Sequence, residues 1–287
     1  MLKEFVINFL KKHFYGLKVF NQLSATTQLL QLQQIQYYKK CLKNKSLPSF
    51  NETGFKVFSQ FEEDGKLLYI FSIIGFGNKT FVDLGSNDCV NSNCANLVIH
   101  HNWKGLFVDG DKKLLAIGKK FYDKYPNPWS YKPKFSHSFI TKNNVNEIIK
   151  NQNIEGEIDF LSIDIDGNDY WIWKALTIIE PKVVVIESQV AFGLHDLIVP
   201  YNEKYTENIE NNFYCGASTL AIYKLAKSKN YRLIGANEYG NNLFFIKNGI
   251  AEVELPEISF ESTLKHPFAS EKFLSKEILE KLIFETE

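Results

Sequence analysis

Residues 79–91 read KTFVDLGSNDCVN, and this stretch decides the fold. The apolar run 80–84 predicts a buried strand, Gly85 opens a series of small and polar residues, and a helical pattern begins at Asn91. A strand that breaks at a glycine turn into a helix is the opening unit of a doubly wound α/β sheet, in which ligands bind beyond the carboxyl ends of the strands. We therefore expect a ligand site beyond Leu84.

The glycine content of the turn narrows the choice of ligand. Dinucleotide-binding turns carry Gly-x-Gly-x-x-Gly so that backbone can approach a pyrophosphate, whereas this turn has only Gly85 before the run 86–89. Asp83-Leu84-Gly85 followed by small polar residues instead resembles the first motif of class I S-adenosylmethionine (SAM) methyltransferases, although Cys89 stands where that motif often has a glycine. The resemblance implies four cofactor-binding residues here: Asp83, Gly85, Ser86 and Asn87.

The amino-acid composition limits the classes of protein to which the chain can belong. The chain has 287 residues, of which 45% are hydrophobic, enough for one large α/β domain with additions. Its 33 basic and 33 acidic residues give a net charge of zero, which argues against a nucleic-acid partner. Four cysteines without Cys-x-x-Cys spacing argue against a zinc site and favour a reducing compartment. No apolar run reaches the roughly 18–20 residues of a membrane span, so we expect a cytoplasmic protein.

Apolar runs predict seven strands, and the last two lie close enough to form a hairpin. This count fits a doubly wound, mostly parallel seven-stranded sheet of the Rossmann-like α/β class, as class I methyltransferases have. The predicted strands are residues 80–84, 104–109, 134–140, 158–165, 182–186, 231–235 and 243–246; the predicted helices are one from about residue 62 and those at 91–101, 112–125, 170–179 and 216–229.

The two ends of the chain lie outside this pattern. Residues 1–50 predict an extension of one or two amphipathic helices, which could cover the core of the domain, contact a second copy in a homo-oligomer, or lie on a membrane surface; the first role is the commonest. Residues 51–250 form the expected methyltransferase domain. Residues 251–287 form a tail with a predicted helix over 276–284.

Two aspartates at the end of the second predicted strand are candidates for binding a ribose. A nucleoside-binding α/β fold places a carboxylate there to accept hydrogen bonds from the ribose hydroxyls. Asp111 could instead cap the following helix, so we favour Asp109. Ser138 and Phe139, at the end of the third strand, would then lie near the adenine.

Acidic residues end the fourth and fifth strands, and three interpretations compete. In the first, Asp166 belongs to a turn with Gly167, and Asn168 or Asp169 caps a helix. In the second, Asp164, which is also a candidate cofactor-binding residue, or Asp166 orients an acceptor hydroxyl next to the cofactor, and one of Asp166 and His195 takes its proton. In the third, Asp166, Asp169 and Glu187 bind Mg²⁺, which prefers oxygen ligands and would acidify the hydroxyl.

The segment 188–213 is too long to be a simple connection between two elements, and loops of this length usually have a function. We expect this segment to cover the acceptor, with Tyr201 and Tyr205 in contact with it.

Several segments in order resemble the FkbM-like class I SAM-dependent methyltransferases, many of which act on sugars and surface glycans. The resemblance implies that Asp83, Gly85 and Asp109 surround SAM and that the segment with Gln60 closes over it. The matching segments, which cover about residues 55–250, are Ser59-Gln60 with Glu63-Asp64-Gly65, and those at 81–85, 102–109, 161–170, 184–187 and 216–218.

The sequence thus predicts SAM-dependent O-methylation of a sugar or a surface-polysaccharide (capsule) precursor. A phosphoryl or phosphoramidate oxygen is an alternative acceptor, since an anionic oxygen needs no general base. Two alternatives from other classes are an NAD(P)-dependent oxidoreductase and an inactive methyltransferase-like partner module that docks through the N-terminal helices.

Overall fold

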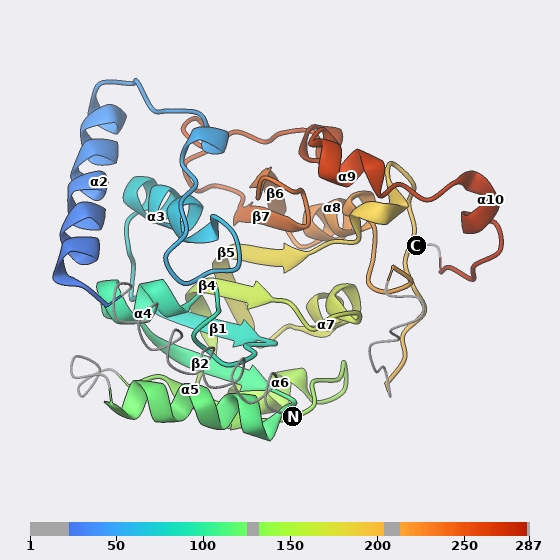
Figure 1. Ribbon diagram of the computed structural model, residues 1–287, viewed down its shortest axis with the longest axis horizontal. Coiled ribbons are helices and arrows are strands. Elements are labelled where there is room, and N and C mark those ends of the chain that lie inside the picture. Colours follow the sequence, from blue (N-terminus) through green and yellow to red (C-terminus); the bar gives the residue numbers. More distant parts are fainter. Residues whose placement is uncertain (1–22, 125–131, 204–212, 286–287) are drawn as a thin grey trace, which may run out of the picture.

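The computed structural model describes residues 23–124, 132–203 and 213–285, and its centre is one seven-stranded sheet (Figure 1). The strand order is β3-β2-β1-β4-β5-β7-β6, and only β7 runs antiparallel to its neighbours. This sheet confirms the predicted fold class. The strands are β1 (Thr80–Leu84), β2 (Lys104–Asp109), β3 (Lys134–His137), β4 (Gly156–Ile163), β5 (Ile179–Glu187), β6 (Tyr231–Ala236) and β7 (Asn242–Lys247).

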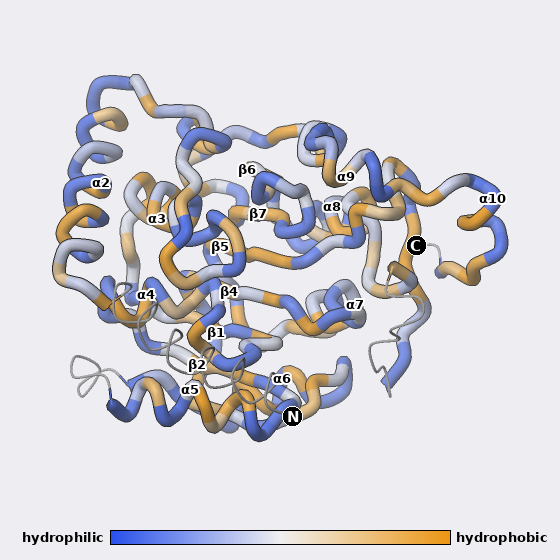
Figure 2. Tube along the Cα trace, viewed as in Figure 1, coloured by the Kyte–Doolittle hydropathy of each residue, from blue (hydrophilic) through white to orange (hydrophobic). Residues whose placement is uncertain are grey.

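Helices cover both faces of the sheet, so its inner strands are buried on both sides. Successive residues of a strand point to opposite faces, and Val82 and Leu84 accordingly belong to one hydrophobic core while Phe81 belongs to the other. Figure 2 shows the resulting hydrophobic runs along β5 and β7. The helices are α2 (Ala25–Lys43), α3 (Glu63–Ile74), α4 (Ala95–His101), α5 (Lys112–Lys124), α6 (Val145–Lys150), α7 (Asp169–Ala175), α8 (Thr219–Ser228), α9 (Pro267–Glu271) and α10 (Lys276–Leu279).

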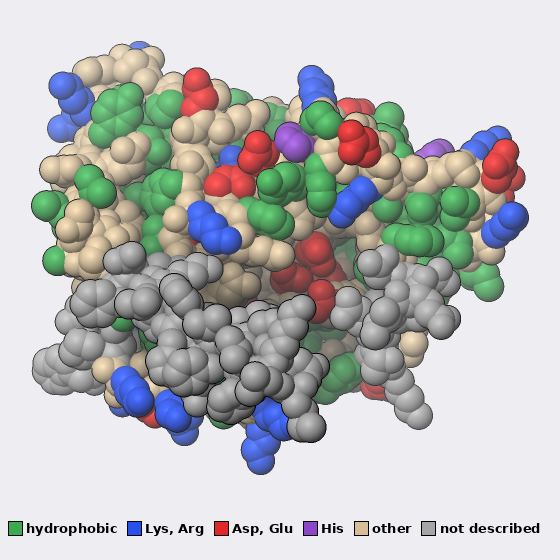
Figure 3. Space-filling model, in the orientation of Figure 1, with side chains coloured by type: hydrophobic (Ala, Val, Ile, Leu, Met, Phe, Trp, Pro, Cys, Tyr) green, Lys and Arg blue, Asp and Glu red, His purple; other side chains and the backbone are tan. Residues whose placement is uncertain are grey.

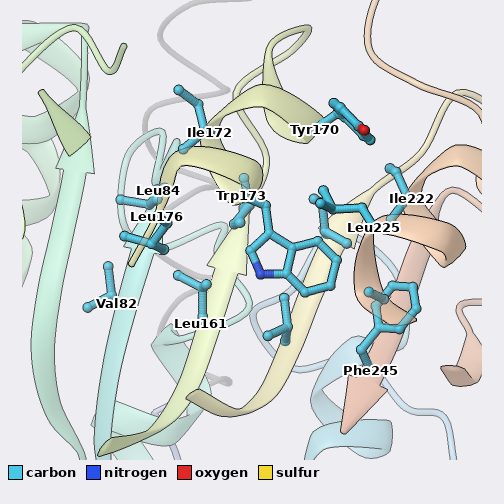
Figure 4. Close-up of a cluster of buried hydrophobic side chains, with 14 of the residues drawn as sticks. Val82, Leu84, Leu161, Tyr170, Ile172, Trp173, Leu176, Ile222, Leu225 and Phe245 are labelled. Carbon is cyan, nitrogen blue, oxygen red and sulfur yellow. The ribbon is translucent and has the colours of Figure 1, made fainter. Parts of the chain in front are cut away.

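The first core packs α6, α7 and α8 against the sheet. Trp173 of α7 lies at its centre, next to Leu161 of β4, Leu225 of α8 and Phe245 of β7 (Figure 4). The second core holds α3, α4 and α5 with Phe107 of β2. Both cores lie along the strands, which leaves the carboxyl ends of β1, β2, β4 and β5 free to build a site.

Helix α2 packs along α3, where the Tyr38 and Tyr69 rings meet edge to face with centroids 5.0 Å apart. Its opposite side exposes Leu29, Leu30 and Tyr37. The predicted helix over the first residues of the chain lies outside the described residues. Among those that are described, no helix combines the length and apolar composition that crossing a bilayer requires.

Several predicted boundaries need correction. The helix expected from residue 91 begins only at Ala95, because the chain first makes a turn in which Asn87 and Cys89 have positive φ. The helix expected over 170–179 ends at Ala175, since β5 already begins at Ile179. In the tail, α10 covers only Lys276–Leu279 of the predicted 276–284.

Candidate active site

A cavity of about 170 Å³ opens beyond the carboxyl ends of β1, β2 and β4, where the sequence predicts a ligand site. Backbone and polar side chains from three strand ends converge there. The lining residues are Gly85, Asn87, Asp109, Gly110, Phe139, Ile140, Asp164, Ile165, Asp166 and Asn168.

The turn after β1 depends on Gly85. Its φ is +85°, and a Cβ on this residue would lie 1.7 Å from the carbonyl oxygen of Asp164, so only glycine lets the ends of β1 and β4 approach this closely. The next residues are tied to β2: the backbone N–H of Ser86 donates to the Val108 carbonyl (3.0 Å), and that of Asn87 donates to Asp109 Oδ2 (2.7 Å).

Asp109 and Asp111 have separate roles. Asp109 lines the cavity, accepts backbone hydrogen bonds from Asn87 and Asp111, and has a pKa raised by burial. Asp111 accepts bonds from the backbone N–H groups of Lys113 (2.7 Å) and Leu114 (3.2 Å), and so caps α5. Of the two, Asp109 is the one placed to meet a ligand.

Three other predicted cofactor residues do not line the cavity. Asp83 is buried behind the turn, where it accepts a hydrogen bond from Ser92 Oγ (2.6 Å) and burial raises its pKa to about 7. The Ser86 hydroxyl is also buried and donates to the Val108 carbonyl. Ser138 is hydrogen-bonded to Ser136. Asp83 and Ser86 therefore support the turn from behind.

The predicted acidic cluster is present at the ends of β4 and β5. Asp164, Asp166 and Glu187 each offer an oxygen, and the three oxygens lie within 4.8 Å of one another. Burial, with the charges of Asp169 and Asp166, raises the pKa of Glu187 to about 8. Burial and the charge of Glu187 raise the pKa of Asp164 well above its usual value. Figure 3 shows acidic side chains at the bottom of a hollow on this face.

Asp169 differs from the other acids. Its two oxygens accept hydrogen bonds from the backbone N–H groups of Ile165 (2.9 Å) and Gly167 (3.0 Å), so it holds the turn between β4 and α7. The group with the spacing for a hard cation is therefore Asp164, Asp166 and Glu187, and not the predicted set that included Asp169.

A second cavity, of about 500 Å³, adjoins the first at Asp166. It contains the acidic end of the site and extends between the segments before α3 and after β5. The lining residues are Gln60, Phe61, Asp166, Gly167, Asp169, Glu187, Ser188, Gln189, Val190, Ala191, Phe213, Cys215, Gly216, Asn241, Phe268, Lys272 and Leu274. Gln60, predicted to close over the cofactor, lines this cavity and not the first one.

The structure does not bring the remaining candidates to either cavity. His195 is exposed, and it is absent from both linings. Tyr201 accepts a hydrogen bond from the Lys142 backbone N–H, and the Lys142 ammonium lies 4.2 Å from its ring centre. Tyr205 falls outside the described residues.

Sequence reasoning missed several lining residues. Asn168 is the N-cap residue of α7, and because it stands two residues after Asp166 its place in the lining could have been found. Asn241 could have been found from the hairpin that pairs with β5. Phe268 and Lys272 come from the tail, whose return to the site no pattern indicated.

Comparison with solved structures finds proteins of related architecture. An O-methyltransferase from Bacillus cereus in complex with S-adenosylhomocysteine (SAH) is 12% identical, with a TM-score of 0.41 over 75% of this chain and 89% of that one. A SAM-dependent methyltransferase from Clostridium acetobutylicum ATCC 824 is 12% identical (TM-score 0.37; 59% and 84% covered). The methyltransferase domain of bacterial CtHen1 is 14% identical (TM-score 0.40; 64% and 97% covered).

No protein-family model and no curated protein sequence matches the chain. These three solved structures are described as methyltransferases, and their likeness to this chain concerns the arrangement of strands and helices. The narrower resemblance to FkbM-like proteins and to glycan-modifying enzymes remains a prediction of the sequence.

Proposed function

We propose that the chain is a SAM-dependent O-methyltransferase whose acceptor is a sugar or a surface-polysaccharide precursor. One observation carries the proposal: two adjoining cavities meet at Asp166, next to Asp164 and Glu187. Such a pair of cavities suits a reaction in which a cofactor and an acceptor must be held end to end.

The first cavity has the features that an adenosyl group requires. Asp109 offers a carboxylate for ribose hydroxyls, the Phe139 ring offers a flat apolar surface for adenine, and the turn at Gly85 presents backbone. This cavity is smaller than ordinary ligand pockets of about 300–1,000 Å³, so a cofactor as large as SAM would extend past Asp166 into the second. SAM supplies a methyl group on a positively charged sulfur, which neighbouring carboxylates would stabilise.

The acidic cluster could deprotonate an acceptor hydroxyl. A general base works best when its pKa lies near the operating pH, and the pKa of Glu187, raised to about 8, meets that condition. Asp166, which lines both cavities, is placed to orient the hydroxyl. We therefore assign the base to Glu187, in place of the exposed His195.

The charge of the cavity lining supports a neutral acceptor. Its described lining has three carboxylates, Asp166, Asp169 and Glu187, and a single cationic side chain, Lys272. A neutral hydroxylated acceptor fits this lining better than a phosphoryl or phosphoramidate oxygen, because Lys272 alone could pair with an anion and the Asp166 carboxylate would repel it.

Binding of the cofactor is tested by calorimetry with SAM and SAH. We expect both to bind, and Asp109→Asn to weaken SAH binding about tenfold or more because the ribose loses a charged acceptor. Asp111→Asn is the matched control: it keeps an oxygen to cap α5 and should leave the affinity unchanged. Absence of binding to the wild-type protein, or a rise in melting temperature with NAD(P) instead, would refute the proposal.

Turnover is tested by screening nucleotide-activated sugars as acceptors. Glu187→Gln and Asp166→Asn should each lower kcat about 100-fold, while SAH affinity stays within a few-fold. Activity that persists in EDTA would support Glu187 as a base, whereas loss of activity in EDTA and its recovery with Mg²⁺ would assign the cluster to a cation. An inactive partner module would bind SAH and methylate none of the acceptors.

A further inference from the structure

Glu63, the first residue of α3, is completely buried and hydrogen-bonded by three donors from two segments. Its Oε1 accepts from Asn237 Nδ2 (3.1 Å) and Asn242 Nδ2 (2.8 Å) of the β6–β7 hairpin. Its Oε2 accepts from the backbone N–H of Phe61 (2.9 Å). One carboxylate thus joins the loop before α3 to the hairpin.

Both joined segments contribute walls of the second cavity. The loop supplies Gln60 and Phe61, and the hairpin supplies Asn241. The Asn237 amide that donates to Glu63 also donates to Asn241 Oδ1 (2.9 Å), and Asn241 lines the second cavity together with Glu187. Glu63 is therefore linked through Asn237 to the part of the cavity wall that carries Asn241.

Aromatic contacts tie the same wall to the tail. Tyr239, at the tip of the hairpin, packs edge to face against Phe61 with ring centroids 4.8 Å apart. It packs in the same way against Phe268 of α9, again at 4.8 Å. Phe61 and Phe268 both line the cavity. Three segments distant in sequence thus form one wall, and Glu63 supplies the buried polar contacts within it.

A carboxylate in the first turn of a helix can act simply by complementing the helix dipole, and an exposed residue would suffice for that. Burying a charge is costly unless hydrogen bonds compensate it. The complete burial of Glu63 and its three specific donors indicate a further role in fixing the segments around it.

We propose that Glu63 is a positioning residue for the acceptor: it holds the loop with Gln60 and Phe61 and the hairpin with Asn241 in the arrangement that shapes the second cavity. The inference rests on the proposed function only in naming the acceptor as the occupant of that cavity. The first cavity, which would hold the adenosine end of the cofactor, has none of these residues in its lining, so a change at Glu63 should affect acceptor binding more than SAH binding.

The test compares Glu63→Gln with Asp159→Asn. Glutamine keeps the size of the side chain, but its single oxygen cannot accept all three bonds, so the loop or the hairpin is released. Asp159 is the matched control because it too is a buried carboxylate, bonded to the Thr80 backbone N–H (3.1 Å) and Lys182 Nζ (3.0 Å), and it belongs to neither cavity lining. Both variants should be destabilised.

Two measurements decide the role of Glu63. Glu63→Gln should raise the KM for the acceptor about tenfold and weaken SAH binding about threefold at most, whereas Asp159→Asn should change neither. Amide hydrogen exchange, which needs no turnover, should become faster in residues 57–61 and 237–241 of Glu63→Gln and not of Asp159→Asn. Unchanged exchange in both segments would overturn the proposal.

If the wild-type protein transfers no methyl group, the proposed function fails, while the exchange result still decides the role of Glu63.

Discussion

At the scale of single residues, the site depends on close backbone contacts that tolerate no side chain. Gly85 brings the end of β1 against the carbonyl of Asp164, the residue from which the acidic cluster starts. Gly75 has the same φ of +85° but no atom within 4 Å of its would-be Cβ. Comparing substitutions at these two glycines therefore separates the cost of backbone strain from the cost of a steric clash.

Gly85→Ala should therefore be much more damaging than Gly75→Ala. Gly75→Ala should cost about 1–3 kcal/mol of unfolding free energy through its unfavourable φ alone. Gly85→Ala adds a clash that must move the end of β1 or β4, so we expect a larger loss of stability together with loss of SAH binding. Urea unfolding and calorimetry measure the two effects; equal losses in both variants would contradict this account.

The sequence located the acids of the site because each one ends a strand, and parallel strands end at the same edge. The sequence could not distinguish Asp109, which lines the cavity, from Asp83, which lies behind it. Asp83 is two residues from Phe81 and so faces the core beneath α4, where Ser92 meets it. His195 could not be excluded, because nothing in a long irregular loop indicates which way its side chains point.

At the scale of elements, α2 is held to the domain by a buried polar cluster as well as by apolar contacts. Gln31 and Asn96 of α4 form a reciprocal amide pair, with Nε2 to Oδ1 at 3.0 Å and Nδ2 to Oε1 at 2.8 Å. His101 Nε2 lies 2.8 Å from the same Gln31 oxygen, and burial lowers the pKa of His101 to about 3, so the ring is neutral and donates to that oxygen.

Gln31→Ala should leave Asn96 and His101 buried without partners. We expect the unfolding free energy to fall by about 1–3 kcal/mol, with no change in SAH affinity because α2 lines neither cavity. Gln33→Ala, on the exposed side of the same helix, is the control and should change stability by less than about 0.5 kcal/mol. Similar values for the two variants would show that the cluster contributes little.

The helices and strands themselves were predictable where a buried strand or a capped helix gives the sequence a recognisable local pattern. The first two strands have the predicted bounds, and α3 begins beside the predicted residue 62. The start of α4 was not predictable, because the turn before it is held by contacts with β2 and α5, such as that between the Tyr122 hydroxyl and the Cys89 carbonyl (2.9 Å).

At the scale of the whole molecule, the buried acids make stability depend on pH. Burial raises the pKa of Asp64 and Asp169 to about 6, of Asp83 to about 7 and of Glu187 to about 8. In each case the folded protein keeps a proton that the unfolded chain has lost. Such groups lower the free energy of unfolding as pH rises from the unfolded to the folded pKa.

Asp83→Asn should isolate one of these groups. Between pH 5 and 7 the wild-type protein should lose up to about 1.4 kcal/mol more stability per pH unit than the variant, whose amide cannot ionise but still accepts from Ser92. Urea unfolding at pH 5, 6 and 7 measures both slopes. Parallel slopes would mean that Asp83 is already ionised in the folded protein at pH 5.

The antiparallel position of β7 has a consequence for synthesis on the ribosome. Strand β7 lies between β5 and β6 although it follows both in sequence, so β5 has no partner on that edge until residue 247 has left the exit tunnel. A nascent chain paused earlier would present a bare apolar strand, the kind of edge to which other chains bind. Pairing of the hairpin that carries Asn241 with β5 and protection of this edge from aggregation are thus the same late event in synthesis.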